Sequence, residues 1–392
     1  MKIDAVVVGA RCAGTATAML LAREGARVML VDKGTYGTDM VSTHALMRGA
    51  VLQLDRWGVL PEIVEAGTPP VHSTTFCYTH TDITVRIEPK HGVAALYAPR
   101  RTLLDRVLVD AAIRSGVDVR YGLQVNGVRV NSRGRVTGVS AVQGGIRRDI
   151  PADIVIGADG LYSTIARCVR APLVIQGRHA AGVLYSYWEG LPAHEYRWWF
   201  KAGVGMGSIP TNDGAACVFV SVPMAEFARE IGGNATRAYT RLIRRISPEF
   251  GERLAESTRV EPVRGFGGHR GFIKRASGPG WALVGDAGYF KDPATAHGIT
   301  DAFRDAQLLS DAIVQGTPAA FTEYEATRLD LSRRLFDVTD QIASLAWTDE
   351  EVQSLHRAFS AEMSREVRVL SAMRSAEMPA RTPPTVEQPR VA

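Results

Sequence analysis

The beginning of the chain constrains the fold more than any other segment, because strand and helix patterns alternate in it without a break. Ile3–Val8 is a nearly continuous apolar run, which is typical of a parallel strand covered on both faces. The turn Gly9–Gly14 follows, then a helix rich in small residues over roughly Ala13–Glu24, which Gly25 ends. A second apolar strand covers Arg27–Val31. This order predicts a complete β-α-β unit at the start of a parallel sheet.

The turn departs at one position from the dinucleotide-binding pattern G-x-G-x-x-G, because Arg11 replaces the second glycine. Gly9 allows the tight turn, Gly14 allows close packing of helix on strand, and the helix N-terminus offers N–H groups to a pyrophosphate. Asp32 ends the second strand, where a carboxylate accepts hydrogen bonds from ribose hydroxyls. We therefore predict a dinucleotide site, with Arg11 as an added cation beside the diphosphate. The candidate residues are Gly9, Arg11, Cys12, Ala13, Gly14, Asp32 and Lys33.

An ordinary strand-to-helix turn whose aspartate only caps is the alternative to this site. Cys12 has a similar alternative, because packing or lining of the cofactor accounts for it better than a redox role. The four cysteines lie far apart and show no metal-ligand spacing, which fits a reducing compartment. We expect no metal site, since seven of the histidines lack ligand spacing and are interpreted as structural or surface residues: His72, His80, His91, His179, His194, His269 and His356.

Composition excludes two classes of partner. The formal net charge is 46 − 41 = +5, but the arginines are scattered among acidic residues, so we expect no nucleic-acid surface. The densest cluster, Arg241 with Arg244 and Arg245, has the spacing of a solvated helix face. No apolar run is long enough to span a membrane, and the chain begins directly with a strand that the fold needs. A cytoplasmic protein is therefore predicted.

The order of the remaining patterns predicts two interleaved domains in an α/β (α+β overall) fold. Asp153–Ala158 and Trp281–Val284 repeat the buried-strand pattern, while the stretch between about Leu173 and Val263 alternates and is rich in aromatic residues. Helices are expected over Thr102–Ser115 and Thr236–Ile246. We assign residues 1–70, 94–172 and 262–315 to a Rossmann-like three-layer nucleotide-binding domain, 71–93 and 173–261 to an antiparallel substrate-binding sheet, 316–375 to C-terminal helices, and 376–392 to a Pro-rich disordered tail.

Three later motifs make the family recognisable. Gly157-Ala158-Asp159-Gly160 is followed by Ser163 and Arg167; Gly285-Asp286-Ala287 is followed by Pro293 and Gly298; and Arg101 precedes an amphipathic helix. With the opening VVVGARCAG…VMLVDKG, these segments resemble the FAD-dependent monooxygenase superfamily of the p-hydroxybenzoate hydroxylase type, especially the subgroup whose first loop reads GARCAG. In the first of these three motifs, Arg167 stands one residue later than the arginine of the family pattern.

The resemblance implies that FAD is held along its whole length. Asp286 would bind the ribityl hydroxyls, Arg101 the ribityl and phosphate region, and the helix start after Pro293 the N1–C2=O edge of the flavin. Asp159 is open between a cofactor contact and a turn former, and His297 between a proton donor and a hydrogen-bonded helix start. His44 shares the ambiguity of His297. The further candidates that the resemblance implies are Arg48, next to the flavin ring, and Gly285, Pro293, Gly298, Ile299 and Thr300.

The resemblance also implies a reaction. NAD(P)H would reduce the flavin, O₂ would form a C4a-hydroperoxide, and one oxygen atom would hydroxylate or epoxidise an apolar or aromatic small molecule. The aromatic residues of the middle segment would roof that substrate or simply form a sheet core: Trp188, Trp198, Trp199 and Phe219.

Several alternatives stay open. A flavin-dependent halogenase shares the first loop, although the halogenase segment W-x-W-x-I-P is reduced here to Ile209-Pro210. A reductase of the geranylgeranyl reductase type is not excluded by the sequence, although the aromatic-rich middle segment gives it no special support. A non-catalytic flavin-binding redox sensor is the third alternative. The C-terminal helices brace the domain interface or support an oligomer.

Overall fold

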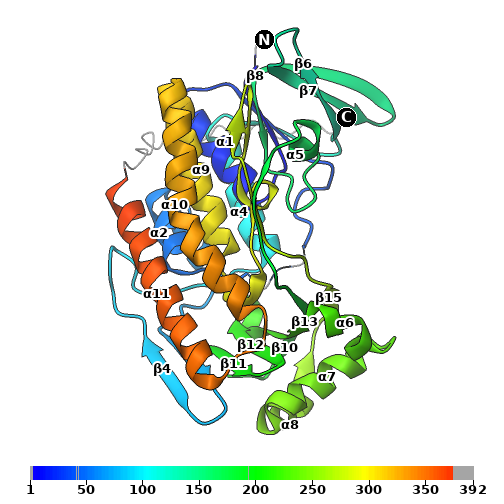
Figure 1. Cartoon of the computed structure of the whole chain (residues 1–392), viewed down its shortest axis with the longest axis vertical. Coiled ribbons are helices and arrows are strands. Elements are labelled where there is room, and N and C mark those ends of the chain that lie inside the picture. Colours follow the sequence, from blue (N-terminus) through cyan, green and yellow to red (C-terminus); the bar gives the residue numbers. More distant parts are fainter. Residues whose placement is uncertain (1–2, 41, 43, 193, 374–392) are drawn as a thin grey trace.

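The computed structural model describes residues 3–40, 42, 44–192 and 194–373. Two large sheets lie at opposite ends of the molecule, and the long helices α10 (Pro318–Ile342) and α11 (Asp349–Ala372) run side by side along one side of it, toward the second sheet (Figure 1). The predicted tail at residues 376–392 lies outside the described residues. The mixed α/β fold class predicted from the sequence is confirmed.

The first sheet is built around a parallel core in which β1 (Ile3–Val8) lies between β2 (Val28–Val31) and β8 (Ile146–Gly157). β5 (Asp118–Arg120) pairs with β2, and β18 (Trp281–Leu283) pairs with β8, both in parallel. β17 (Ser277–Gly278) adds an antiparallel edge. β2, β18 and the ends of β1 and β8 are apolar because both faces of the sheet are covered by protein there.

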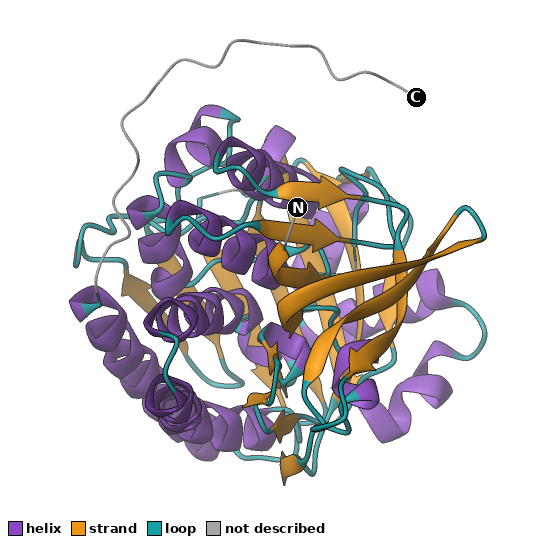
Figure 2. Ribbon diagram, turned by 90° about the horizontal axis from the view of Figure 1, so that it is seen from above, coloured by secondary structure: helices purple, strands orange, loops and turns teal. Residues whose placement is uncertain are grey.

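Helices cover one face of this sheet and strands the other, which gives three layers (Figure 2). α1 (Cys12–Arg23), α4 (Arg101–Arg114) and α9 (Gly298–Gln315) pack on the side that Ala5 and Val7 face. β6 (Gln124–Val130), β7 (Val136–Gln143) and the start of β8 form an antiparallel extension on the side that Val6 and Val8 face.

The second sheet has the order β14-β10-β13-β12-β11-β3-β4, with β15 also beside β10. All its pairs are antiparallel except β3 with β11. Its strands are β3 (Ser73–Cys77), β4 (Asp82–Arg86), β10 (Ala181–Glu189), β11 (Tyr196–Lys201), β12 (Val204–Pro210), β13 (Ala215–Pro223), β14 (Thr258–Arg259) and β15 (Arg264–Phe266). A small third sheet joins β9 (Leu173–Gln176), β16 (Phe272–Lys274) and β19 (Tyr289–Phe290).

Helices α6 (Met224–Ile231), α7 (Ala235–Ile246) and α8 (Pro248–Glu256) follow the last long strand of the second sheet. The sequence predicted only the middle one. The signal for α8 was present, because Ser247 accepts a hydrogen bond from Phe250 N–H as N-cap and a proline occupies the first helical position. Shorter helices complete the chain: α2 (Arg48–Arg56), α3 (Leu60–Glu65) and α5 (Thr164–Cys168), with single 3₁₀ turns at η1 (Asn212–Gly214), η2 (Gly285–Ala287) and η3 (Pro293–Thr295). In the described part of the chain, no helix combines the length and the apolar character needed to cross a bilayer.

Candidate functional site

The register of the parallel strands brings the predicted motifs to one edge of the first sheet. Val8 pairs with Val31 on one side and with Gly157 on the other, and Gly157 pairs in turn with Leu283. The four strands therefore end level with one another. The residues that follow them, which carry the sequence motifs, share the carboxyl edge where ligands of parallel sheets bind.

Glycines allow the segments at this edge to approach closely. A methyl group on Gly9, whose φ is +110°, would lie 2.3 Å from the Ala158 carbonyl oxygen. A methyl group on Gly285 would lie 2.9 Å from the Cβ of Ala13, and one on Gly14 would overlap the Gly9 carbonyl oxygen. These contacts explain the glycines physically and show that the first turn and the late Gly-Asp turn are adjacent.

Two helix N-termini at this edge have no side-chain cap in the described part of the chain. Among the described residues no side chain caps the start of α1 or of α9, whereas Ser163, Thr317 and Thr348 cap α5, α10 and α11. Gly298 is exposed at the start of α9, Ile299 is half-buried, and a methyl group on Gly298 would meet open space. Uncapped N–H groups with a positive helix end form a site for negative charge. The preceding 3₁₀ turn starts at Pro293 and is capped by the Asp292 side chain.

Arg11 and Arg101 meet at one buried carboxylate beside the start of α1. Asp105 accepts hydrogen bonds from Arg11 at 2.7 Å and from Arg101 at 2.9 Å, and Arg11 also donates to the Thr38 carbonyl at 2.6 Å. Two guanidinium groups thus face one carboxylate, which leaves a local excess of positive charge. Cys12 donates to the same Asp105, and burial raises the pKa of its thiol to about 12. A protonated, buried thiol is consistent with packing and not with redox reactivity.

Asp32 and Asp159 hold their own turns. Asp32 accepts hydrogen bonds from Ala10 N–H at 2.8 Å and Gly34 N–H at 2.6 Å, one on each carboxylate oxygen. Each oxygen retains a second lone pair that a ribose hydroxyl could use. Asp159 accepts from the N–H groups of Thr164 and Ile165 at the start of α5, which is the turn-forming role considered from the sequence. Lys33 is exposed beside Asp32.

Asp286 lies in the late Gly-Asp turn at this edge, packed among neighbouring charged groups while part of the residue stays exposed to solvent. The protein that surrounds it and the nearby Asp301 carboxylate raise its pKa to about 6, against the opposing effects of Lys291 and Arg101. A carboxyl group in this position suits a hydroxyl-bearing ligand, because it accepts hydrogen bonds when ionised and donates one when protonated.

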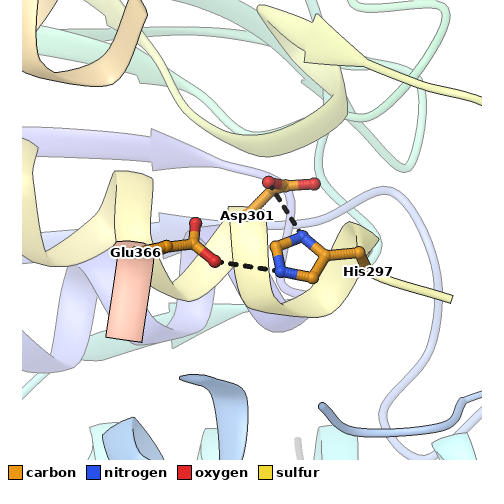
Figure 3. Close-up of side chains that lie close together, drawn as sticks. All are labelled: His297, Asp301 and Glu366. Carbon is orange, nitrogen blue, oxygen red and sulfur yellow. Dashed lines mark hydrogen bonds and ion pairs between the residues drawn. The ribbon is translucent and has the colours of Figure 1, made fainter. Parts of the chain in front are cut away.

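The start of α9 carries a histidine held on both sides. His297 Nε2 lies 2.9 Å from Glu366 and Nδ1 lies 3.3 Å from Asp301 (Figure 3). Burial and the Lys291 ammonium lower the pKa of His297, but the carboxylates of Glu366 and Asp301 outweigh them, so it is raised overall. The three residues have ligand types suited to a metal ion. However, Lys291 pairs with Asp301, and Arg304 pairs with both acids, so the arrangement is an ionic network.

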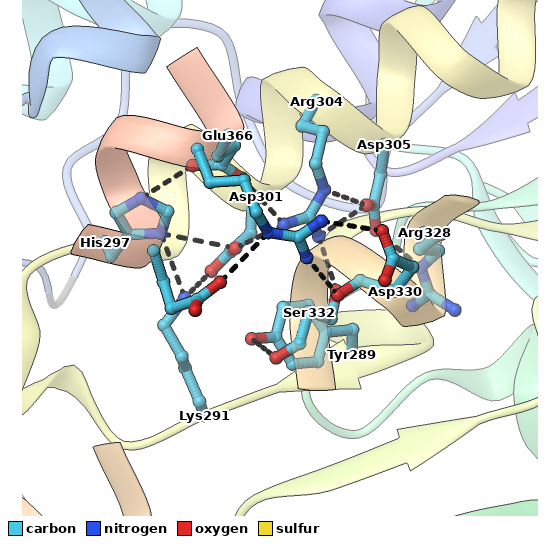
Figure 4. A network of polar contacts seen from close by, with 12 residues as sticks. Tyr289, Lys291, His297, Asp301, Arg304, Asp305, Arg328, Asp330, Ser332 and Glu366 are labelled. Atoms are coloured by element: carbon cyan, nitrogen blue, oxygen red, sulfur yellow. Dashed lines mark hydrogen bonds and ion pairs between the residues drawn. The ribbon is translucent and has the colours of Figure 1, made fainter. Parts of the chain in front are cut away.

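This network continues from α9 into α10 and α11 (Figure 4). Arg304, which is fully buried, donates to Asp301 at 3.0 Å, Glu366 at 2.8 Å and Asp305 at 2.9 Å. Asp305 also accepts from Arg328 at 2.9 Å and from Gly285 N–H at 3.3 Å. The network therefore fixes the late Gly-Asp turn relative to the three helices.

Two predicted flavin-side residues make contacts of a structural kind. His44 is buried, has a φ of +45° and pairs through Nε2 with the Tyr187 hydroxyl at 2.9 Å. Burial, then Arg100 and Arg101, lowers its pKa to about 3. Arg48 donates to the carbonyls of Val93 and Glu88 at 2.8 and 2.7 Å. Thr300, whose buried hydroxyl has no hydrogen-bond partner among the described residues, lies against α2, since a methyl group on Gly49 would be 2.7 Å from it.

A cavity of about 490 Å³ lies between the second sheet, α11 and the start of α9. Its buried wall is largely aromatic, while the charged lining residues Arg86, Glu88, Lys90 and Arg357 are exposed. His297, Thr295 and Ala294 also line it, so the cavity adjoins the start of α9. The aromatic lining residues are Phe76, Tyr78, Tyr196, Trp198, Phe200 and Phe359.

Strand alternation decides which predicted aromatic residues reach the cavity. Trp198 lines it, whereas its neighbour Trp199 points to the opposite face of the sheet and packs on Phe250 of α8, with ring centroids 4.8 Å apart. Trp188 stacks on Tyr239 of α7 on that same face. Phe219 packs on Trp198 within the sheet core. Of the four aromatic residues proposed from the sequence, one lines the cavity.

Sequence reasoning missed the contribution of α11. Several of its residues line the cavity at helical spacing, among them His356, which the sequence suggested was structural or at the surface. The signal was the spacing of three and four residues along the helix, which places these side chains on one face. The α11 residues in the lining are Gln353, His356, Arg357, Phe359, Ser360, Met363, Ser364 and Val367.

Comparisons with known proteins agree with this geometry. A family model described as FAD binding domain matches residues 2–339. The chain is 27% identical over 356 residues to digeranylgeranylglycerophospholipid reductase from Methanothrix thermoacetophila, covering 88% of this chain and 85% of that protein. It is 26% identical over 348 residues to 6-methylpretetramide 4-monooxygenase from Streptomyces rimosus, covering 85% and 78%. The structure of the flavin-dependent brominase Bmp2 superimposes with a TM-score of 0.79 at 16% identity, covering 95% and 94% of the two chains, which shows a shared fold.

Proposed function

Because the chain belongs to the FAD binding domain family, we propose that this FAD-dependent oxidoreductase is a monooxygenase. In this proposal it takes electrons from NADH or NADPH and transfers one oxygen atom of O₂ to an apolar, aromatic small molecule. The observation that carries the proposal is the aromatic cavity of about 490 Å³ that adjoins the start of α9. A cavity of this size and lining suits a flat molecule of several rings.

The residues at the carboxyl edge fit FAD. We assign its diphosphate to the uncapped start of α1 with Arg11 and Arg101, and its adenosine ribose to Asp32. The ribityl chain falls to Asp286, and the flavin ring to the uncapped start of α9. Bound there, FAD would supply the electron transfer between nicotinamide and O₂ that side chains cannot carry out.

The protein's own contribution is positioning, charge and exclusion of water. The N–H groups of Gly298 and Ile299, at the positive end of α9, favour negative charge on a neighbouring ring. The charge network around Arg304 keeps this helix start in place from beneath. The aromatic wall of the cavity holds the substrate beside that ring and keeps bulk water away from it.

The test combines FAD-loaded protein, NADH or NADPH, ¹⁸O₂ and a set of fused-ring phenols that begins with 2-naphthol. We expect NAD(P)H oxidation to accelerate when a phenol that fits the cavity is present, and the product to carry one ¹⁸O atom. An unlabelled product would contradict the monooxygenase proposal. Flavin binding without NAD(P)H oxidation would favour a redox sensor.

The cofactor assignment has its own test. Asp286→Ala should lower the FAD content of purified protein, because it removes the carboxyl group assigned to the ribityl chain. Asp118→Ala is the matched control, since Asp118 is exposed on β5 and pairs with Arg120 at the surface. Equal FAD content in the two variants would show that the cofactor lies elsewhere.

A reductase that saturates an isoprenoid chain is the second candidate. It is favoured by the relative named digeranylgeranylglycerophospholipid reductase, which aligns over 88% of this chain, and by the aliphatic part of the cavity lining, Ile83, Val85 and Ile87. Saturation of geranylgeraniol without oxygen, by FAD-loaded protein whose flavin has first been reduced with NADPH or dithionite, would support it. A halogenase gains less support, because Met206–Pro210 lies in β12, pairs on both sides with neighbouring strands and supplies no residue to the lining.

A further inference from the structure

One polar pair stands within the aromatic wall of the cavity. The Tyr78 hydroxyl and His356 Nδ1 are 2.8 Å apart, and both residues line the cavity. Tyr78 directly follows β3, whereas His356 belongs to α11, so the hydrogen bond joins the second sheet to α11 within the cavity lining. The ring of His356 lies against Phe200, with centroids 4.2 Å apart, and near Phe76 at 5.4 Å.

The imidazole of His356 is uncharged at neutral pH. Burial lowers its pKa to about 4. A neutral imidazole has one nitrogen that donates and one that accepts a hydrogen bond. Tyr78 uses Nδ1, and among the described residues no hydrogen bond to Nε2 is found. The ring therefore keeps one polar atom for a ligand, as donor or as acceptor according to the direction of the Tyr78 hydrogen bond.

A second histidine–tyrosine pair shows that the exposure to the cavity is particular to this one. His44 and Tyr187 also share a hydrogen bond, at 2.9 Å, but neither residue belongs to the cavity lining. His297 does line the cavity, yet both its nitrogens lie against carboxylates. Three histidines in this region are buried or half-buried. Among them, only His356 both lines the cavity and has a single hydrogen-bond partner among the described residues.

We propose that the His356–Tyr78 pair binds a hydroxyl group of the substrate, so that the cavity selects hydroxylated aromatic molecules over the corresponding hydrocarbons. This inference rests on the proposed function, because it takes the cavity as the substrate site. A hydroxyl group both donates and accepts, so it satisfies Nε2 in either tautomer of His356. A hydrocarbon in the same place removes water from Nε2 without replacing its hydrogen bond, which disfavours binding.

The experiment measures equilibrium binding of 2-naphthol and of naphthalene to the oxidised, FAD-loaded protein, followed by the flavin absorbance spectrum. It needs neither NAD(P)H nor oxygen, so it does not depend on turnover. We expect the wild-type protein to bind 2-naphthol about fivefold more tightly than naphthalene, the preference that one net hydrogen bond provides. His356→Phe should abolish this preference and leave naphthalene affinity within about twofold.

Further variants separate the pair from general damage. Tyr78→Phe should reduce the preference, because it leaves His356 without its orienting partner. His356→Gln should keep part of it, since an amide both donates and accepts. His72→Phe is the control: His72 is an exposed histidine outside the lining, so its preference should match the wild type. Circular dichroism and FAD content establish that each variant is folded.

The outcomes divide clearly. Equal affinity of the wild type for 2-naphthol and naphthalene, lack of binding of both, or an unchanged preference in folded His356→Phe would overturn the proposal. A lost preference in His356→Phe supports it, even where no labelled product forms. In that case the monooxygenase reaction fails while the binding pair stands, so the two proposals can be told apart.

Discussion

His297 and His356 line the same cavity, but the protein treats them in opposite ways. Both nitrogens of His297 lie against carboxylates, and those carboxylates pair with Lys291 and Arg304. His356 has one described hydrogen bond and an aromatic surrounding. The first histidine is part of a charge network that supports a helix start. The second lines the cavity, and the described residues supply no hydrogen bond to its Nε2. The difference teaches that residue type alone does not separate a histidine that stabilises the fold from one that binds a substrate. The number of its polar atoms without a hydrogen-bond partner is the better guide.

Substitutions in the charge network around His297 and Arg304 should destabilise the protein more than substitutions at His356. Arg304→Met removes the central cation and leaves Asp301, Asp305 and Glu366 with fewer partners in a buried place. We expect the free energy of unfolding to fall by about 3–5 kcal/mol, the typical result of breaking a buried charge pair by removing one partner. Urea unfolding followed by circular dichroism measures it.

A surface arginine provides the control for that variant. Arg365 pairs with Asp330 and Glu362 in a more exposed setting, so Arg365→Met should cost less than about 1 kcal/mol. Similar losses in the two variants would mean that the buried network contributes no more than surface ion pairs, and the contrast with His356 would lose its basis.

The two faces of β11 sharpen the comparison at a single strand. Trp199 packs on Phe250, so Trp199→Ala should lower the free energy of unfolding by about 3 kcal/mol or more. The same variant should leave naphthalene affinity within about twofold, because Trp199 lies on the face away from the cavity. Trp198→Ala alters the cavity wall and should weaken naphthalene binding. Equal binding losses in both variants would place the ligand outside this cavity.

Acid should act on the network more gradually, since protonation neutralises a carboxylate without removing its side chain. Burial opposes the effect, but Lys291, His297 and Arg304 hold the pKa of Asp301 below its ordinary value, and His297 and Arg304 do the same for Glu366. The stabilisation that these two carboxylates contribute is therefore complete above their pKa values in the unfolded chain, which are about 4. It is lost as the pH falls through their lower pKa values in the folded protein.

His297 should produce a second limb in the plot of unfolding free energy against pH, with the opposite slope. Its folded pKa is raised, so its contribution is complete below the unfolded value of about 6.5 and is lost as the pH rises through the folded value. Urea midpoints measured from about pH 3 to pH 9 should show both limbs in the wild type. Glu366→Gln should diminish each of them, and unchanged limbs in that variant would assign the pH dependence to other groups.

The sequence predicted the carboxyl edge better than the cavity, for a physical reason. Gly9 and Asp32 follow their strands directly, and Asp286 stands in the turn that follows β18, so strand register brings them to one edge. The cavity depends on long-range packing: α11 returns to the second sheet more than two hundred residues after β3, and no local pattern specifies that contact. Arg304 likewise meets Glu366 only because α9 and α11 both pack on α10 and α2. A lone histidine such as His356 carries no spacing that marks it.

The smallest effect on stability is expected at the recognition pair itself. Tyr78→Phe removes one hydrogen bond and keeps the ring, so the free energy of unfolding should change by about 1 kcal/mol or less. Urea unfolding of this variant beside Arg304→Met tests the comparison directly, since both remove hydrogen bonds to a buried or half-buried partner. A loss above about 2 kcal/mol would mean that the His356–Tyr78 bond holds α11 against the second sheet. The His356–Tyr78 pair would then stabilise the fold as well as bind the substrate. In that respect it would be similar to the charge network around Arg304.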